Sequence, residues 1–179
     1  MIALTMMLMM ACTDDDSEGT AINPEPLPLI VPSITPDPIT DRPHTDGTIG
    51  RLAVADTGQP AASLSLGTDG DQIVFAPAAL TAPAGLIRLT FTNNATAPAM
   101  RHNVVIVTAG TEESVGVGGI QAGEAGHYVP DSPDVLAATT MLRAGTSASL
   151  VVDLPPGEYA FICTFPGHYL TMRGTLTVT

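Results

Sequence analysis

Hydrophobic and polar residues alternate in short runs from about residue 62 to the end of the chain. In residues 86–92, the side chains of Ile87, Leu89 and Phe91 fall on one face of an extended strand. Further strands are predicted at residues 71–75, 148–154, 158–163 and 173–178, and at residues 102–108, which are rich in Val and Ile. Short strands with frequent turns and no helical repeat predict an all-β fold, a Greek-key β-sandwich, for residues 62–179.

Two features of this predicted domain lie in its second half. The glycine-rich stretch 110–133 is compatible with a short helix or with loops alone. In the strand at 158–163, Tyr159, Phe161 and Cys163 share one face, and Leu176 and Val178 point inward from the last strand.

The chain begins with a different pattern. Residues 1–11 are almost wholly apolar, Cys12 follows, and residues 13–19 are polar and acidic. Eleven residues are too few to span a bilayer, which needs about 20, but they match the apolar core of a signal peptide. An apolar run, small Ala11 and then Cys12 resemble the lipobox of bacterial lipoproteins, although Met9 stands where Leu is usual and no basic residue precedes the run.

The lipobox resemblance implies that Cys12 is lipidated and that the protein is tethered to a membrane by acyl chains. The alternative is a secretory signal with an incidental cysteine. With either, we expect residues 1–12 to direct the protein outside the cytoplasm, to the periplasm or the cell surface.

Residues 13–61 form an acidic, proline-rich linker in this scheme. The segment has prolines at positions 24, 26, 28, 32, 36, 38 and 43, and its apolar residues show neither the helix nor the strand periodicity. Such a segment favours a disordered, extended tether of about 3.1 Å per residue. His44 lies in this linker, and we expect it to be solvated and not to bind metal.

The charge of the chain restricts its partners. Eighteen acidic residues against six arginines and no lysine give a formal charge of −12. We therefore expect that the protein does not bind nucleic acid. The negative charge would either attract a partner with a basic face or only make the protein more soluble. Cys12 and Cys163, the two cysteines of the chain, are too few for a disulfide framework.

Three side chains with metal-binding atoms follow one another near the C-terminus with the spacing Cys163-x4-His168-x3-Met172. Cys163 ends one predicted strand, Met172 immediately precedes the next, and His168 lies on the loop between them. A second imidazole, His102, opens a distant strand, and we expect it to arrive from the opposite sheet. One thiolate, two imidazoles and a thioether form the set of donors that selects copper.

Other interpretations of this motif explain less of it. A structural zinc site uses four strong donors, usually several thiolates, and a hard cation needs oxygen ligands. A cysteine nucleophile with a histidine base leaves Met172 without a role. A buried thiol with a surface histidine and a core methionine leaves the spacing unexplained. The sequence has no His-x-His pair, which argues against a multicopper oxidase or nitrite reductase.

The motif Cys163-Thr-Phe-Pro-Gly-His168-x-x-x-Met172, followed by residues 173–178, resembles the C-terminal signature of azurin and auracyanin-type cupredoxins. Residues 69–75, 100–104 and 127–130 are also similar to segments of that family, so the resemblance covers roughly residues 63–179. It implies a cupredoxin-like domain with one mononuclear type 1 (blue) copper that carries single electrons, and not an enzyme.

The resemblance also implies a role for individual residues. His102, Cys163 and His168 would be the equatorial copper ligands, with Met172 axial. Asn103 would hydrogen-bond to the Cys163–Thr164 segment, and the backbone N–H of Phe165 would point at the Cys163 sulfur. Electrons would pass through the exposed edge of His168, surrounded by Pro166, Met100 and Tyr169.

The sequence departs from the azurin pattern at two places. Arg101 stands where azurins have Gly, which favours a four-ligand site without a close fifth contact, and the disulfide near the start of azurin domains has no counterpart here. His127, in the glycine-rich stretch, is expected on the rim of the site and not at a second metal.

Two functions follow from this resemblance. The first is electron transfer outside the cytoplasm, with a cytochrome or a membrane oxidoreductase as the redox partner. The alternative is a copper-binding lipoprotein that delivers or buffers copper.

Overall fold

The computed structural model describes residues 48–50 and 59–179. The expectations for the signal or lipobox segment, for Cys12 and His44, and for nearly all of the linker lie outside these residues. None of the helices in the described part of the chain is long and apolar enough to cross a membrane.

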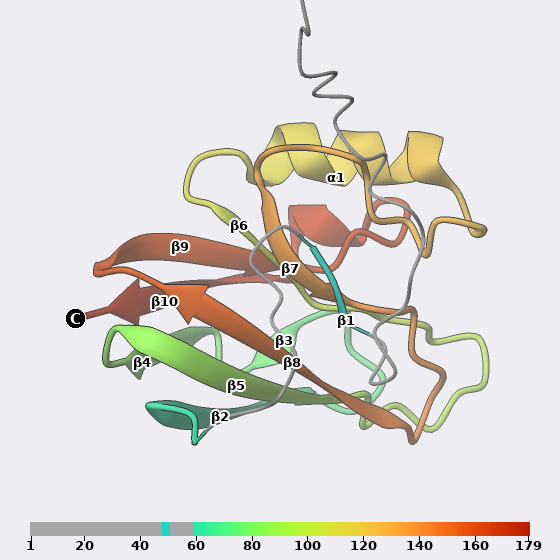
Figure 1. Ribbon diagram of the computed structural model, residues 1–179. Helices are drawn as coiled ribbons and strands as arrows, with labels where there is room; N and C mark the ends of the chain where they lie inside the picture. Colours follow the sequence, from blue (N-terminus) through green and yellow to red (C-terminus); the bar gives the residue numbers. More distant parts are fainter. Residues whose placement is uncertain (1–47, 51–58) are drawn as a thin grey trace, which may run out of the picture. The chain divides into compact units, whose positions relative to one another are not determined.

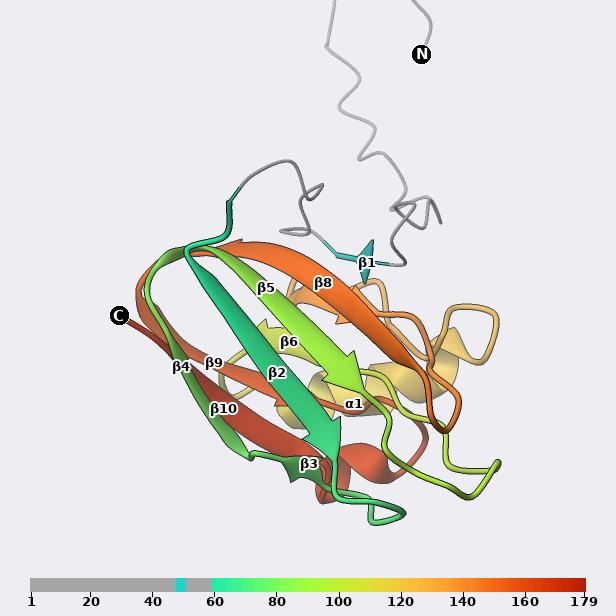
Figure 2. The same cartoon turned by 90° about the horizontal axis from the view of Figure 1, so that it is seen from below.

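Two β-sheets pack face to face, and one short helix covers the outer side of the larger sheet (Figure 1, Figure 2). The six-stranded sheet has the order β1-β7-β6-β9-β10-β4 and the four-stranded sheet the order β3-β2-β5-β8. The elements are β1 Thr48–Ile49, β2 Ala62–Thr68, β3 Phe75–Ala76, β4 Ala79–Ala82, β5 Gly85–Thr92, β6 Val105–Thr108, α1 Glu112–Ala122, β7 Val135–Thr139, β8 Ser147–Leu154, β9 Gly157–Ile162, the 3-10 helix η1 His168–Leu170, and β10 Arg173–Val178. The predicted all-β sandwich is confirmed.

The main core lies between the two sheets. Ile87, Leu89 and Phe91 of β5 are all buried, as the alternation in this strand predicts. The ring of Phe75 packs edge-on against Phe91 of one sheet and Phe161 of the other, with ring centroids 5.7 and 5.3 Å apart. These aromatic contacts join the two sheets through residues near the C-terminal ends of β5 and β9.

A second apolar cluster lies on the opposite face of the six-stranded sheet, beneath α1. Its buried members are Val105, Val107, Val115, Val135, Ala138, Ala160 and Ile162. Strands β6 and β9 are therefore buried on both faces, which explains why residues 104–107 form an unbroken apolar run and not an alternating one.

Several strand predictions need correction. Residues 71–74 do not form a strand, because Asp69 and Gly70 begin a turn in which Gly70 has φ +58° and the Gln72 N–H donates to the Asp69 carbonyl at 3.1 Å. Only β3 follows this turn. Strands β2, β4 and β7 were not predicted. β4 and β7 are short and rich in Ala and Thr, whereas β2 does alternate, with Leu64 and Leu66 each following a serine, and this signal was missed.

The expectation that His102 arrives from the opposite sheet is wrong. Strand β6 pairs antiparallel with β9 in the six-stranded sheet, with Val105 opposite Ile162. His102 lies three residues before Val105, and Cys163 lies one residue after Ile162. In an antiparallel pair these two positions extend from the same edge of the sheet, so the metal-binding residues come from neighbouring strands.

Strand β1 lies inside the range that was expected to be linker. Its residues pair with β7, Thr48 opposite Thr139 and Ile49 opposite Ala138. The half-buried Ile49 side chain also packs against the apolar cluster beneath α1. This part of the chain therefore adds an edge strand to the six-stranded sheet.

The sequence of helix α1 has a low helix propensity, because three of its eleven residues are glycine. Close packing of these glycines against neighbouring segments determines where the helix lies. The ring of Tyr169 lies directly against Gly116, where a Cβ would overlap it. At Gly119 a Cβ would lie 2.6 Å from the Tyr128 carbonyl oxygen and 2.9 Å from the Thr164 carbonyl oxygen. The two glycines let the helix approach the loop that follows Cys163.

Replacing Gly119 with Ala is expected to destabilise the protein by about 1–3 kcal/mol, because the overlap with two backbone carbonyls outweighs the gain in helix propensity of about 1 kcal/mol. Gly118→Ala gains the same helix propensity, and its Cβ would meet only the Pro130 ring, 3.0 Å away. This variant should therefore lose less stability. Urea unfolding of both variants measures the difference. Equal stabilities of the two variants would show that the close packing of α1 against residues 128 and 164 does not require glycine at position 119.

Candidate metal centre

Three metal-binding atoms converge at one end of the six-stranded sheet. The Cys163 Sγ lies 3.8 Å from His102 Nδ1 and 3.7 Å from His168 Nδ1, and the two Nδ1 atoms are 3.2 Å apart. His102 and Cys163 are fully buried, whereas His168 is half-buried. Within the described residues, these three side chains form a cluster suited to holding a metal ion.

The dimensions of the cluster fit a metal ion. The point equidistant from the three atoms lies about 2.1 Å from each, close to the bond lengths of about 2.0–2.3 Å between a first-row metal and imidazole nitrogen or thiolate sulfur. Both histidines present Nδ1 toward the sulfur, so the donors point at a common centre without rearrangement. One soft sulfur and two imidazoles in a near-trigonal set are the donors that suit copper.

The surroundings of the site keep its groups uncharged when no metal is bound. Burial raises the pKa of the Cys163 thiol to about 12, and backbone hydrogen bonds from Asn103 and Phe165 to the sulfur oppose this shift. Burial, together with the nearby His168, lowers the pKa of His102 to about 4. Burial also lowers the pKa of His168. Both imidazoles are therefore neutral at neutral pH, and metal binding must displace the thiol proton.

Met172 closes the loop that carries Cys163 and His168. Its N–H donates to the His168 carbonyl at 2.7 Å, and its carbonyl accepts from the Cys163 N–H at 3.0 Å. The side chain is fully buried and belongs to the same core cluster as Cys163. Gly167 has φ +81°, a left-handed conformation that glycine adopts without strain, and this turn leads into η1 and His168.

Asn103 fastens the two ligand-bearing segments to each other. Its Nδ2 donates to the Thr164 hydroxyl at 2.9 Å, and its Oδ1 accepts from the Thr164 N–H at 2.9 Å. The expected hydrogen bonds between Asn103 and the Cys163–Thr164 segment are thus present. The backbone N–H of Phe165 bonds to the Cys163 sulfur as expected, and that of Asn103, which sequence reasoning did not anticipate, bonds there too.

The glycine-rich stretch contributes to the site through its backbone. His127 and Tyr128 both have positive φ, 51° and 58°, which is uncommon for two successive non-glycine residues. This conformation turns the His127 carbonyl toward Asn103 Nδ2, which donates to it at 3.1 Å. His127 was expected at the rim through its side chain, and its half-buried imidazole lies outside the three-residue cluster.

Tyr128 begins a row of aromatic rings that ends at the metal-binding residues. Its ring lies 5.2 Å from Phe165, and the Phe165 ring lies 4.7 Å from His168. The His168 ring in turn lies 5.0 Å from that of His102. Sequence reasoning missed Tyr128, because its contact depends on the backbone conformation at residues 127–128.

The loop that carries His168 has several apolar residues. Pro166 is exposed, and Met100 and Tyr169 are half-buried, with Tyr169 turned onto α1. Leu170, which sequence reasoning did not include, is 61% exposed and is the most exposed large apolar side chain in the described residues. Pro166 and Leu170 each lie within two residues of the half-buried His168, and the expected patch of Pro166, Met100 and Tyr169 around it stays a prediction.

Arg101 and His102 are held by the segment that precedes β8. The His102 N–H donates to the Leu142 carbonyl at 3.1 Å, and the Leu142 N–H donates to the His102 carbonyl at 2.8 Å. Asn93 adds bonds from its Nδ2 to the carbonyls of Met100, at 2.9 Å, and Leu142, at 3.3 Å. The Arg101 side chain forms an ion pair with Glu124 at 2.6 Å.

Asp71 holds the loop that leads to His102. Its carboxylate accepts hydrogen bonds from the Thr96 N–H at 2.7 Å, the Thr96 hydroxyl at 2.9 Å and the Ala97 N–H at 3.0 Å. The backbone bonds from Ala97 and Thr96, followed by the hydroxyl bond, lower the pKa of Asp71 below its ordinary value. This carboxylate therefore stabilises the folded protein in its ionised form.

Asp71→Asn is expected to lower stability at neutral pH, because an amide cannot accept all three bonds. The stabilisation by Asp71 is fully present above its unfolded pKa and is lost as the pH falls through its lower folded pKa. The difference between wild type and variant should therefore shrink below about pH 4. Thermal unfolding as a function of pH measures it, with exposed Asp153→Asn as the charge-matched control. A difference that does not vary with pH would contradict this role.

Comparison with known proteins identifies the family of the chain. Residues 62–179 match the family model described as copper binding proteins, plastocyanin/azurin family. The chain therefore belongs to this family of cupredoxins, of the azurin and auracyanin type, and its cofactor is copper.

Individual relatives are similar to large parts of the chain. Auracyanin-B of Chloroflexus aurantiacus is 40% identical over 126 residues, 67% of this chain and 53% of the relative. Outer membrane protein H.8 of Neisseria meningitidis is 38% identical over 95 residues, 51% of this chain and 52% of the relative. The chain thus spans about half the length of these two relatives. A solved structure of auracyanin B covers 75% of this chain and 99% of its own, with a TM-score of 0.67 and 38% identity.

Proposed function

We propose that the protein is a blue copper electron carrier in which His102, Cys163 and His168 would bind one copper ion, with Met172 as a further, weaker ligand. The convergence of three donor atoms within 4.8 Å of one another carries this proposal. His102 precedes β6, Cys163 follows β9, and His168 lies on η1 of the next loop. When bound there, copper supplies a single-electron couple between its Cu(I) and Cu(II) states.

The protein fixes the geometry of the ligands in advance. Cys163 and His102 are fully buried, Asn103 joins their two segments, and the backbone hydrogen bonds of Met172 close the loop. A rigid arrangement prevents the donors from following the different geometries that Cu(I) and Cu(II) prefer. This keeps the rearrangement on each electron transfer small. Burial of the ligands also favours a carrier over copper delivery, which requires donors that an acceptor protein can reach.

His168 connects the site with the surface. It is the one half-buried member of the three-residue cluster, and Pro166 and Leu170 beside it are exposed. An apolar surface loses water easily when another protein approaches it. We expect electrons to enter and leave through the His168 ring, with a cytochrome or a membrane oxidoreductase as the partner.

Voltammetry of the copper-loaded protein tests this function together with the role of Met172. The wild type should show one reversible one-electron couple. Met172→Leu should keep the blue colour and raise the reduction potential, because loss of the thioether removes a donor that stabilises Cu(II). Met141→Leu, at a buried methionine outside the ligand loop, serves as the control and should leave the potential unchanged. An irreversible wild-type couple, or equal potentials in both variants, would contradict the proposal.

We further propose that the domain works outside the cytoplasm, tethered to a membrane through Cys12. The apolar segment that ends at Ala11, the proline-rich stretch that follows, and the similarity to an outer membrane protein support this location. Mass spectrometry of the N-terminus of the protein isolated from membranes tests it. A diacylated Cys12 is expected, and an unmodified N-terminus cut elsewhere would refute the tether.

A further inference from the structure

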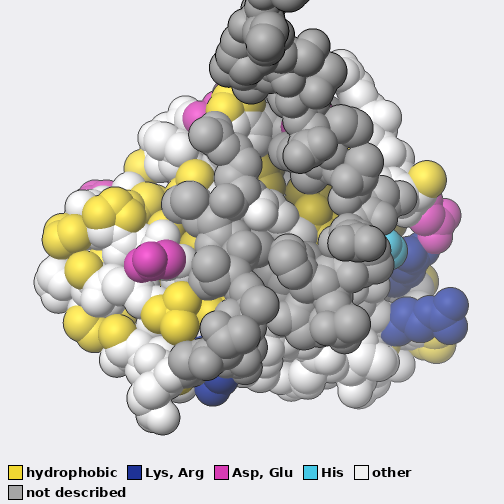
Figure 3. Space-filling model, in the orientation of Figure 1, with side chains coloured by type: hydrophobic (Ala, Val, Ile, Leu, Met, Phe, Trp, Pro, Cys, Tyr) yellow, Lys and Arg dark blue, Asp and Glu magenta, His cyan; other side chains and the backbone are white. Residues whose placement is uncertain are grey.

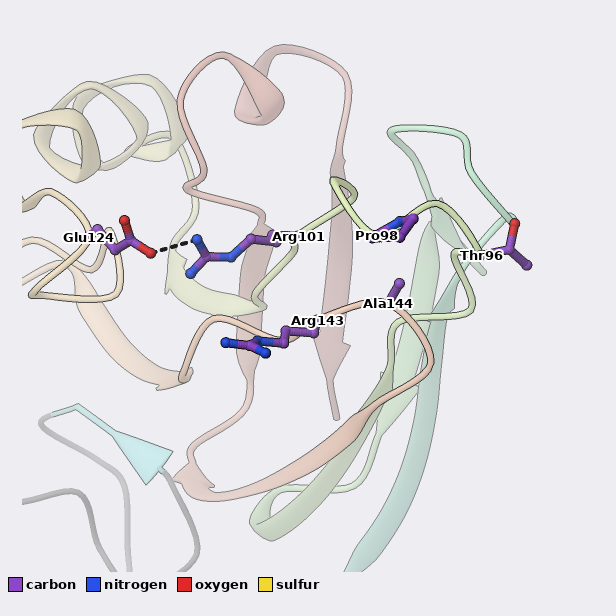
Figure 4. Close-up of a pocket in the computed structure, with 6 residues that line it drawn as sticks. All are labelled: Thr96, Pro98, Arg101, Glu124, Arg143 and Ala144. Atoms are coloured by element: carbon purple, nitrogen blue, oxygen red, sulfur yellow. Dashed lines mark hydrogen bonds and ion pairs between the residues drawn. The ribbon is translucent and has the colours of Figure 1, made fainter.

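A pocket beside the metal centre gathers two of the four arginines in the described residues. It has a volume of about 470 Å³ and is lined by Thr96, Pro98, Arg101, Glu124, Arg143 and Ala144. Both guanidinium groups point toward the loop that carries Glu124 (Figure 4). In the space-filling view, dark blue arginine side chains lie beside an acidic side chain at the right-hand edge of the domain (Figure 3).

The charges in this pocket are not balanced. Two guanidinium groups face one carboxylate, so the pocket carries a local positive charge on a chain whose formal charge is −12. Glu124 is 67% exposed and bonds only one nitrogen of Arg101. A local excess of positive charge of this kind attracts small anions.

The hydrogen-bond donors of the pocket are also incompletely used. The Nε atom of Arg101 is buried and has no hydrogen-bond partner within the described residues. The exposed side chain of Arg143 makes no hydrogen bond or ion pair in that same part of the chain. A buried donor without a partner is costly, and a guanidinium presents a fork of donors that matches two oxygen atoms.

We propose that this pocket binds a small dissolved oxyanion, a phosphate or a carboxylate, between Arg101 and Arg143. The anion presents two or more oxygen atoms to the two guanidinium groups. Glu124 competes for Arg101, so it limits the affinity of the pocket. The volume is within the range of small-molecule sites and leaves space for such an anion with bound water.

The position of the pocket couples the anion to the metal centre, a step that rests on the proposed function. Arg101 directly precedes His102, Arg143 directly follows Leu142, and the paired N–H and carbonyl groups of His102 and Leu142 join the two segments. A negative charge near the copper favours the oxidised state, so a bound anion should lower the reduction potential. By linkage, the oxidised protein should bind the anion more tightly than the reduced protein.

Titration of the ¹⁵N-labelled full-length, metal-free protein with sodium phosphate tests the binding independently of copper. The Nε–H signals of Arg101 and Arg143 should shift as phosphate is added and stop shifting once the site is full. Sodium chloride at equal ionic strength should not cause these shifts. Arg143→Gln should weaken phosphate binding by about tenfold, since it removes a charge-assisted fork. Glu124→Gln should strengthen binding by about threefold or more, because it frees Arg101.

Two variants with the same changes in charge serve as controls. Arg88→Gln on β5 and Glu113→Gln on α1 lie outside the pocket and should each alter phosphate affinity by less than about twofold. Shifts that do not saturate, an Arg143→Gln protein that binds like wild type, or equal effects of Glu124→Gln and Glu113→Gln would overturn the proposal.

Voltammetry of the copper-loaded protein then tests the coupling. Phosphate should lower the potential of wild type more than chloride does, and this difference should disappear in Arg143→Gln. An unchanged wild-type potential under saturating phosphate would refute the coupling and leave the binding site in place. A protein that binds phosphate but not copper would refute the proposed function alone.

Discussion

Cys163→Ser should abolish the blue colour of the copper-loaded protein. The intense absorption of such a site comes from charge transfer between a thiolate sulfur and Cu(II), and Cys163 provides the one thiolate at this position. Removing outer partners of metal ligands already lowers metal affinity by about 10–100-fold, so loss of the ligand itself should cost more than that. Absorption spectroscopy and copper titration measure both effects.

The other cysteine of the chain supplies the matched control. Cys12→Ser makes the same chemical change at a position outside the predicted domain, and the purified variant should keep the colour and affinity of the wild type. A Cys163→Ser protein that stays blue would remove Cys163 from the site. Loss of colour in both variants would show that the effect is not specific to Cys163.

Asn103→Ala should lower both the stability of the protein and its affinity for copper. The side chain makes three hydrogen bonds with Thr164 and His127, and Asn103 and Thr164 are fully buried. Truncation leaves these partners unsatisfied, at a cost of about 2–4 kcal/mol. It also releases the Cys163 segment from the His102 segment, so copper affinity should fall by about 10–100-fold.

Asn94→Ala is the control for this prediction. Asn94 is exposed, and its side chain donates to the Thr68 carbonyl at 3.0 Å, away from the ligand segments. Its loss should cost less than about 1 kcal/mol and leave the copper spectrum unchanged. Urea unfolding of the metal-free proteins separates the stability effect from copper binding. An Asn103→Ala protein as stable as Asn94→Ala would contradict the role of Asn103 as the link between the segments.

The metal-binding residues could be identified from the sequence because most of them are local. Cys163, His168 and Met172 lie within ten residues, and the strand alternation on either side fixes where the loop begins and ends. His102 is distant in sequence, and composition alone does not determine which sheet carries it. The antiparallel pairing of β6 with β9 decides this, and such long-range pairing leaves no local signal.

The surroundings of the site were harder to predict. Helix α1 contains three glycines and weak amphipathicity, so neither propensity nor periodicity indicates a helix there. Its position depends on the contacts of Gly116 and Gly119, and the contribution of Tyr128 depends on left-handed backbone angles at two non-glycine residues. Tertiary packing determines these features, and a single sequence does not show them. The pocket between Arg101 and Arg143 likewise requires the pairing of His102 with Leu142.

The assignment of a blue copper site is tested most directly by titrating the full-length protein with Cu(II) while recording its optical and paramagnetic resonance spectra. We predict that one equivalent of copper produces an intense blue absorption and a narrow copper hyperfine splitting. Uptake of copper without the intense absorption, with the wide splitting of an ordinary Cu(II) complex, would contradict a site formed by His102, Cys163, His168 and Met172.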